Sequence, residues 1–206
     1  MSFRPIGPRR IPSRRRPVTR AALLVCGLMV VLGVTASAQP VPEKTQLPIF
    51  FKLLTYDRVL WDDAPGRLTI GLLHRPEDER SQANLTAMID VLTASTSKTI
   101  NGVPFDFLAI GWGPDGDLAA RLDASDVDVL YVTDGHGDVL DQVSAASRRL
   151  GLLTLSARAA WVDDGLALGI GLDAGRPRII VNLAAVEAEG HELDSRVLRL
   201  CKVVGR

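Results

Sequence analysis

The chain alternates between short apolar runs and segments of mixed polarity, and this alternation continues over most of its length. Apolar residues recur at spacings of three and four between the runs, as at Leu85, Met88, Ile89 and Leu92, which predicts helices there. The runs themselves predict buried strands at 67–74, 103–110, 127–133 and 152–157, after a dense apolar helix at 47–61. Strand and helix in turn predict an α/β domain with a mainly parallel sheet.

The pattern changes near the C-terminus. Two apolar runs, 166–172 and 178–183, are joined by Asp-Ala-Gly-Arg at 173–176, which predicts a β-hairpin. Helices are expected from Leu183 and from Ser195 to the end of the chain. The predicted fold class is therefore α/β: a single Rossmann-like three-layer domain, whose mainly parallel sheet carries a C-terminal β-hairpin and closing helices.

The first 38 residues differ from the rest. Residues 1–20 hold seven arginines and no acid, and residues 21–36 are uncharged and almost wholly apolar. Ala36-Ser37-Ala38 then supplies small residues two positions apart, so the order is that of a secretory signal peptide with its cleavage site. We therefore expect export to the periplasm. An uncleaved inner-membrane anchor is the alternative, and Arg14-Arg15 leaves Sec and Tat export both open.

This division sets the expected organisation: a signal peptide over 1–38, a flexible lead-in over 39–46 with two prolines, and the α/β domain over 47–206. Removing the signal changes the electrostatics, because the full chain has 24 basic and 24 acidic residues. The seven arginines leave with the signal, so the rest has 17 basic and 24 acidic residues, a net charge of −7. A domain this acidic is a poor candidate for binding nucleic acid.

The chain has two cysteines. Cys26 lies in the apolar part of the predicted signal, so Cys201 is alone in the mature protein. An intramolecular disulfide, a Cys-x-x-Cys site and a cysteine-rich metal site are therefore excluded. A single cysteine at an apolar position is usually a small buried hydrophobic residue.

Two loops follow predicted strands, where ligands of open α/β sheets gather. The loop 111–117, with Asp115 and Asp117, is read as a turn and a helix cap, and a polar-ligand or cation loop is the alternative. The loop 133–138 carries Asp134, His136 and Asp138, which would suit a metal or acid-base group. The three histidines of the chain lie in separate segments, so a solvated loop is favoured.

Motifs of catalysis are absent from the sequence. The chain shows no P-loop lysine, no Gly-x-Gly-x-x-Gly spacing and no Gly-x-Ser-x-Gly elbow. We therefore predict no enzyme activity, no cofactor and no metal.

The sequence VNLAAVEAEGHELDSRVLRLCKVV, residues 181–204, resembles the C-terminal signature of the YfiR family. In that signature, a strand ends in Asn-Leu, a helix with small residues and a glycine follow, and a Ser-Lys-Leu-Leu-Arg-Leu-Ala motif closes the pattern. Lys52 and Trp61 stand at matching places in a segment that resembles the family's opening helix. The signature positions of the closing segment are Asn182, Leu183, Gly190, Ser195, Leu198, Arg199 and Leu200.

The resemblance covers nearly all of 47–204 and implies a periplasmic regulatory protein without enzyme activity. The best-known members restrain an inner-membrane diguanylate cyclase by contacting its periplasmic part, which lowers cyclic-di-GMP output. The implied partner is thus the periplasmic part of such a cyclase or of a sensor histidine kinase, and the implied state is a homodimer. Some members use disulfides as redox input, and the single Cys201 departs from that pattern.

The residues themselves give the signature a structural interpretation first. Asn182 and Ser195 are expected to cap the helices that follow them. The apolar positions Val197, Leu200 and Cys201, together with Val204, are expected to face the core, and a dimer or partner contact is the alternative. A stand-alone periplasmic protein that binds a small ligand between the two loops is the second reading of the whole chain, and a hydrolase is the third.

Overall fold

In the computed structural model, which describes residues 41–62, 66–96, 98–114 and 116–205, eight strands form one sheet in the order β2-β3-β1-β4-β5-β6-β7-β8. Pairing is parallel among β3, β1, β4, β5 and β6, as the sequence predicts. The strands are β1 (Leu68–His74), β2 (Thr99–Ile100), β3 (Val103–Gly111), β4 (Val129–Val132), β5 (Leu153–Ser156), β6 (Leu168–Asp173), β7 (Arg176–Asn182) and β8 (Lys202–Val204).

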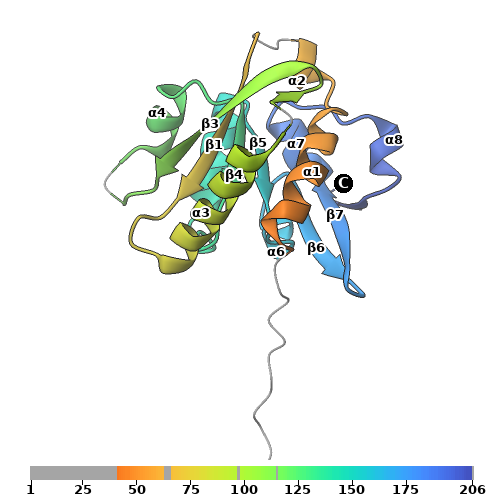
Figure 1. The fold of residues 1–206 in the computed structure, drawn as a ribbon. Helices are drawn as coiled ribbons and strands as arrows, with labels where there is room; N and C mark the ends of the chain where they lie inside the picture. Colours follow the sequence, from red (N-terminus) through yellow and green to blue (C-terminus); the bar gives the residue numbers. More distant parts are fainter. Residues whose placement is uncertain (1–40, 63–65, 97, 115, 206) are drawn as a thin grey trace, which may run out of the picture. The chain divides into compact units, whose positions relative to one another are not determined.

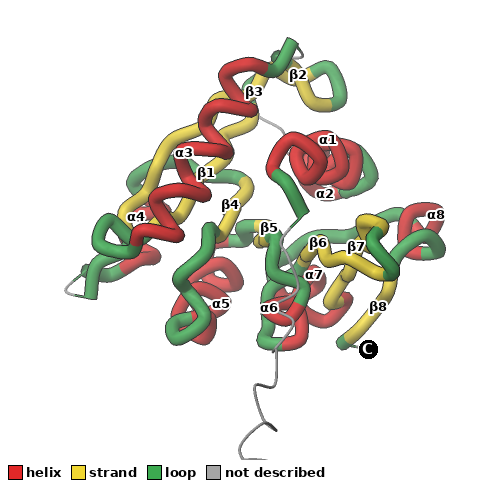
Figure 2. Tube along the Cα trace, turned by 60° about the horizontal axis from the view of Figure 1, so that its bottom comes forward, coloured by secondary structure: helices red, strands yellow, loops and turns green. Residues whose placement is uncertain are grey.

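Helices cover both faces of the sheet within this unit (Figure 1). The helices are α1 (Glu43–Leu54), α2 (Val59–Asp62), α3 (Glu79–Ala94), α4 (Leu118–Asp123), α5 (Leu140–Leu150), α6 (Ala160–Asp163), α7 (Leu183–Ala188) and α8 (Ser195–Leu198). Apolar side chains of α1 and α3 pack in one core cluster, and those of α4 and α5 pack in another. Figure 2 shows α1 on one side of the strands and α5 on the other, so the three-layer α/β prediction is confirmed.

The middle strands explain why the sheet is buried on both faces. All four residues of β4 and all four of β5 are buried; β4 is wholly apolar apart from the Tyr131 hydroxyl, and β5 alternates leucine with the small polar residues Thr154 and Ser156. Strands buried along their whole length are typical of parallel sheets covered by helices on both sides. The alternation of strand and helix in the sequence therefore predicted this part of the architecture correctly.

The hairpin of β6 and β7 reverses the chain direction in the sheet. Both residues of its turn have positive φ, with 49° at Ala174 and 76° at Gly175, as expected for a two-residue hairpin turn of type I′. β7 is therefore antiparallel to β6, and β8 adds to β7 in parallel at the sheet edge. As a result, α7 begins at the end of the sheet opposite to the carboxyl ends of β1, β4 and β5.

The first helix differs from the prediction. It begins at Glu43, so residues 43–46 belong to α1 and not to a lead-in, and it ends at Leu54 instead of running on to Trp61. The reason for the break is Asp57, whose Oδ1 accepts hydrogen bonds from the backbone N–H groups of Val59 (3.0 Å) and Leu60 (3.2 Å). This carboxylate starts α2 as a separate helix. The predicted signal peptide lies outside the described residues.

The end of the chain differs as well. The helix predicted from Ser195 stops at Leu198, and the next residues form β8 along β7. A four-residue helix is too short to persist by itself, whereas the β7 edge offers backbone partners. Cys201 and Val204 therefore do not lie on a helix face. Of the apolar positions expected there, Val197 is buried, Cys201 and Val204 are half-buried, and Leu200 is 75% exposed.

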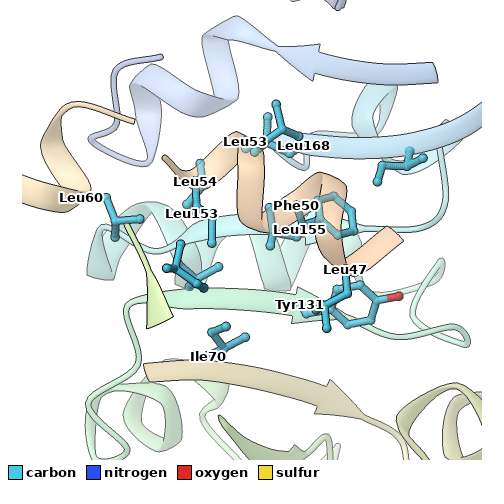
Figure 3. Packing of buried hydrophobic residues seen from close by; sticks show 14 of the residues in the cluster. Leu47, Phe50, Leu53, Leu54, Leu60, Ile70, Tyr131, Leu153, Leu155 and Leu168 are labelled. Atoms are coloured by element: carbon cyan, nitrogen blue, oxygen red, sulfur yellow. The ribbon is translucent and has the colours of Figure 1, made fainter. Parts of the chain in front are cut away.

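The larger core cluster forms around α1 (Figure 3). Phe50 meets the ring of Tyr131 edge-on, with the ring centroids 6.0 Å apart. The Tyr131 hydroxyl donates to the side-chain oxygen of Gln46 at 2.9 Å, which satisfies two polar groups within the core. Leu53 and Leu54 are fully buried against the strands. The helix that opens the described chain is therefore a central part of the domain.

Candidate functional site

Asn182 opens the closing segment, residues 182–204, and its side chain contacts three separate parts of the chain. Its side-chain oxygen accepts from the N–H of Ala185 at 3.0 Å, so it caps α7 as predicted. Its amide nitrogen donates to the carbonyl oxygen of Val162 at 2.9 Å. Gly205 lies so close that a Cβ there would fall on the Asn182 side chain. The signature asparagine thus fixes α7 against α6 and against the strand that precedes Gly205.

Two signature residues behave differently. Gly190 has φ 81°, a conformation that glycine adopts without strain and that redirects the chain after α7. Ser195 is exposed and does not cap α8, which corrects the prediction. The cap is Asp194, whose carboxylate accepts from the N–H of Arg196 at 2.8 Å. Arg196 and Arg58 lower the pKa of Asp194 through hydrogen bonds and charge.

The segment between Gly190 and Asp194 docks on the link between α1 and α2. Asp57 forms an isolated antiparallel bridge with Leu193. The N–H of Arg58 donates to the carbonyl of Glu192 at 2.9 Å, and the N–H of Asp194 donates to the carbonyl of Tyr56 at 2.9 Å. Residues from the two ends of the described chain therefore pair like two strands.

Beneath this contact lie three buried ionisable side chains. Nδ1 of His191 is 2.7 Å from Oδ2 of Asp57, and its Nε2 is 3.1 Å from the carbonyl oxygen of Gly151. Glu189 accepts hydrogen bonds from the hydroxyl groups of Ser147 and Thr154 and from the Thr154 N–H, at 2.8–3.0 Å. Burial raises the pKa of Glu189 to about 7, although these donors oppose the shift.

The surface beside this cluster is apolar and basic. Leu200 is 75% exposed and Leu172, on the β6–β7 hairpin, is 41% exposed. By strand alternation, Arg176 and Arg178 of β7 lie on the same face as Lys202 of β8. Leu172 pairs with Pro177 and therefore lies on the other face of the hairpin. We define the contact surface by five residues of this region: Arg176, Arg178, Arg199, Leu200 and Lys202.

The charges of the contact surface are largely unused inside the domain. Arg178 lies 3.5 Å from Asp173, in a pair whose members are both at least half exposed. Among the residues that the structure describes, no ion pair engages Arg176, Arg199 or Lys202. Free cations around an exposed leucine are typical of a surface that binds a partner.

The other signature residues support the fold. Trp61 donates from Nε1 to the carbonyl oxygen of Leu54 at 2.6 Å, and so closes the turn between α1 and α2. Lys52 is exposed, with its Nζ 5.1 Å from the centre of the Tyr56 ring. Leu183 is half-buried, and Leu198 packs on the edge of the larger core.

The loop after β4 places Asp134 at the carboxyl ends of the parallel strands. Its carboxylate is held by the guanidinium of Arg158, with Nε–Oδ1 at 2.6 Å and a second contact between Nη2 and Oδ2. The side chain of Asn84 accepts from the N–H of Asp134 at 3.3 Å and donates to Glu43 at 2.8 Å. Glu43, Asn84 and Asp134 border a pocket of about 260 Å³ together with Arg80 and two alanines.

The remaining loop residues do not converge on this pocket. His136 is fully buried, donates from Nδ1 to the carbonyl of Thr133 at 2.9 Å, and meets the Trp112 ring edge-on. Burial lowers the pKa of His136, so its imidazole is neutral. Asp138 turns away to pair with Arg75 at 2.7 Å. The acid-base or metal group considered for this loop is therefore not formed, and the described part of the chain has no cluster of metal ligands.

The loop after β3 has a capping role. Asp117 is exposed and caps α4 by accepting from Ala119 at 2.9 Å and from Ala120 at 3.3 Å, which confirms the turn-and-cap interpretation. Hydrogen bonds from these amides, and the charge of Arg149, lower the pKa of Asp117. Asp115 lies outside the described residues.

Sequence reasoning missed the partners that lie far apart in the chain. Asn84 and Arg158 border the loop that carries Asp134, and Asp57 and Glu189 surround His191, yet none of the four was selected as a candidate. A signal existed for Glu189 and His191, which flank the signature Gly190 in a segment otherwise rich in small and apolar residues. The other pairings depend on the sheet order, which the local pattern does not determine.

A family model described as YfiR/HmsC-like (DUF4154) matches residues 48–202, which is most of the chain. The chain belongs to the YfiR/HmsC-like family. This confirms the resemblance found in the sequence, and it indicates a periplasmic protein with a regulatory rather than a catalytic role. The matched range contains most of α1, the whole hairpin and the closing segment up to residue 202, so nearly all residues of the sites described above belong to a YfiR/HmsC-like domain.

Solved structures support the fold alone. The ABC domain in complex with L-Trp from Streptococcus pneumonia is 14% identical, with a TM-score of 0.55. A conserved domain protein from Vibrio cholerae is 12% identical with a TM-score of 0.56, and each match covers 79% of this chain and 60% of that chain. The ligand-free, open structure of a substrate-binding protein with adhesive properties from Clostridium difficile is 18% identical, with a TM-score of 0.50 over 71% of this chain and 57% of that one.

This YfiR/HmsC-like chain thus spans about 60% of the length of those structures. No curated protein matches it. Within the described residues, no helix has both the length and the apolar character to cross a membrane.

Proposed function

We propose that this YfiR/HmsC-like protein is an exported, non-enzymatic regulator. It restrains an inner-membrane diguanylate cyclase or sensor histidine kinase by binding the periplasmic part of that enzyme. Family membership supports a periplasmic regulatory role. The observation that carries the proposal is Leu200, which is 75% exposed and lies in sequence between Arg199 and Lys202, two cations that no ion pair engages within the described residues.

Charge complementarity indicates the kind of partner. Outside residues 1–38 the protein has 24 acidic and 17 basic residues, so a local basic surface is contrary to its overall charge. A partner with an acidic patch around an apolar pocket would bury Leu200 and pair with Arg176, Arg199 and Lys202. The exposed leucine would act as the central anchor, with the cations at the rim setting orientation and association rate.

Restraint by contact is a shift of populations. The regulator binds the inactive conformation of the enzyme's periplasmic part more tightly than the active one. The ratio of the two affinities sets how far the population of active enzyme, and with it the enzyme output, can fall. We further propose that the regulator acts as a homodimer, since a two-fold partner would then engage two contact surfaces at once.

The partner contact can be tested by crosslinking and pull-down from membranes of cells that make the protein. Wild-type protein is expected to recover an inner-membrane protein with a cytoplasmic cyclase or histidine kinase domain. Leu200→Asp and Arg199→Glu should each lower that recovery about tenfold, because one loses the anchor and the other reverses a rim charge. Arg67→Glu, at an exposed position just before β1 that pairs with Asp106, is the matched control.

Unchanged recovery with both surface variants would place the contact elsewhere. Failure to recover any membrane protein with an enzymatic domain under crosslinking would contradict the regulator function itself. Melting temperatures equal to wild type are required of each variant, so that loss of binding is separated from loss of fold.

A second function is favoured by the pocket at the carboxyl ends of the strands. Its lining carries both signs of charge, with Glu43, Asp134 and Arg80. The side chain of Asn84 is held between the Glu43 carboxylate and the backbone N–H of Asp134. A small ligand with both a cationic and an anionic group would match this arrangement.

A thermal-shift screen with small zwitterions and with monovalent amines tests this pocket. One compound is expected to raise the melting temperature by about 2–4 °C at saturating concentration. Asn84→Ala should abolish the shift, and Thr86→Ala, on the exposed side of the same helix, should keep it. A shift that survives Asn84→Ala, or no shift with any compound, would rule out this pocket as the binding site.

A further inference from the structure

Three ionisable side chains are buried together at a place where neither proposed function uses them. Asp57 is 2% exposed, Glu189 is 1% exposed and His191 is 6% exposed. Charged side chains are almost never this buried unless they are paired, because water no longer stabilises their charge. They lie between the two ends of the described chain, under the backbone contacts of Tyr56–Arg58 with Glu192–Asp194.

The hydrogen-bond partners determine where the proton of His191 lies. A carbonyl oxygen only accepts, so the contact with Gly151 requires a proton on Nε2. Nδ1 lies 2.7 Å from Oδ2 of the Asp57 carboxylate, although the two atoms are not aligned as a hydrogen bond, and a carboxylate this close favours the protonated imidazole. His191 is therefore an imidazolium beside the Asp57 carboxylate, and the net charge of this pair is zero. A neutral imidazole in its place would bind one proton fewer.

Glu189 adds a second proton-binding group. Within the described residues its hydrogen-bond partners are Ser147 of α5 and Thr154 of β5, both uncharged, and His191 acts on it only through its charge. Burial favours the neutral carboxyl group, and burial is the largest effect on its pKa, which is raised to about 7. For His191, burial lowers the pKa, but Asp57, the Gly151 carbonyl and the charge of Glu189 together raise it above the ordinary value.

We propose that Asp57, Glu189 and His191 form a proton-sensitive latch, which holds residues 189–204 on the α1–α2 link when protons are bound and releases them as protons leave. The periplasm follows the pH of the surrounding medium, so an exported protein would meet such changes directly. The latch precedes α8 and β8 in the chain, and the segment that they form carries Arg199, Leu200 and Lys202 of the contact surface. Its regulatory consequence therefore rests on the proposed partner contact, whereas the latch itself does not.

The direction of the effect follows from linkage. In the unfolded chain, Glu189 and His191 lose their protons near ordinary values, and in the folded protein both hold them to higher pH. The folded latch therefore binds more protons than the released segment, so its stability is greatest in mildly acidic medium. It is lost as pH rises through about 7, where Glu189 becomes charged, and further as His191 becomes neutral and leaves Asp57 as a buried unpaired anion.

The surroundings of the latch contain few other charges. On the α1–α2 link, Arg58 faces outward and pairs with Glu192 at 2.7 Å. α5 contributes Ser147 and the Gly151 carbonyl, and β5 contributes Thr154, so neither adds a titrating group. Elsewhere, burial lowers the pKa of His74 and of His136, which opposes the latch by favouring folding at higher pH. The test therefore has to report on residues 189–204 and not on global stability.

Hydrogen exchange of the wild-type protein, followed by mass spectrometry and corrected for the intrinsic exchange rate at each pH, supplies that local report. Protection of peptides within 189–204 is expected to fall about tenfold or more between pH 6 and pH 8.5, while β4 and β5 change by less than about threefold. Glu189→Gln, which mimics the protonated carboxyl group, should reduce the fall to about threefold or less. Glu192→Gln, exposed in the same segment, should behave as wild type.

Equal protection of 189–204 at both pH values would contradict the proposed latch. The proposal would also fail if Glu192→Gln lost as much of the pH dependence as Glu189→Gln. If Glu189→Gln does not fold, the ¹⁵N shifts of the wild-type imidazoles decide: His191 should be cationic at pH 7, with two N–H groups, and a neutral His191 at pH 6.5 contradicts the proposal. These measurements use no partner, so their failure is distinct from failure of the pull-down, which is done with surface variants at a single pH.

Discussion

Replacing Leu54 with alanine is expected to lower the free energy of unfolding by about 3 kcal/mol. Leu54 is the last residue of α1, and its side chain is 0% exposed. Figure 3 shows it near Leu60 and Leu153. Removing its terminal methyl groups leaves a cavity that the packed strands cannot close, and the apolar contacts are lost as well. Chemical denaturation at pH 7, followed by far-UV circular dichroism, measures the change.

Leu200→Ala is the matched control, since it removes the same atoms from a side chain that is 75% exposed. Its free energy of unfolding should stay within about 0.5 kcal/mol of wild type. A similar loss of stability in both variants would show that Leu200 is packed in solution, and the contact surface would then have to be abandoned.

Replacing Asp57 with alanine is expected to lower the free energy of unfolding by about 3 kcal/mol. The change leaves Nδ1 of His191 without its partner, and it removes the acceptor for the N–H groups of Val59 and Leu60 at the start of α2. Buried polar groups left without partners account for the size of the effect. Denaturation at pH 6, where His191 is charged in the wild type, gives the largest difference.

Arg58→Ala serves as the comparison, because the neighbouring arginine is more than half exposed and forms only surface ion pairs. Its removal should change stability little, since exposed ion pairs contribute little. An Asp57→Ala protein as stable as Arg58→Ala would mean that the buried pair does not fasten the chain ends, and the latch would lose its basis.

The parallel part of the sheet could be predicted because neighbouring residues alone carry its pattern of apolar runs and helical spacings. β4 is a continuous apolar run and β5 a short leucine-rich one, each between helical periodicities, and such runs have few alternatives. The hairpin was predictable for the same reason, since its two runs meet at a short turn containing Gly175. The caps at Asp117 and Asn182 also follow from side-chain chemistry within three residues.

The ends of elements and the site partners could not be predicted in this way. The apolar periodicity of α1 continues past Leu54, whereas the helix stops because Asp57 is held by the distant His191 and accepts hydrogen bonds at the start of α2. Likewise, residues 202–204 fit a helix or a strand, and the free edge of β7 decides between them. The pair of Asp134 and Arg158 depends on β4 lying beside β5, a tertiary fact.

The Arg58–Glu192 contact joins residues separated by 134 positions, and the buried pair of Asp57 and His191 lies beside it. Contacts of such long sequence separation form late in folding, because a large loop must close before they contribute. The α1–α2 link therefore acquires its C-terminal neighbours last, although α1 itself packs on α3 and the central strands, which come earlier in the chain. A chain that ends before residue 191 would therefore keep its first helix packed but would leave Asp57 buried without the histidine that pairs with it.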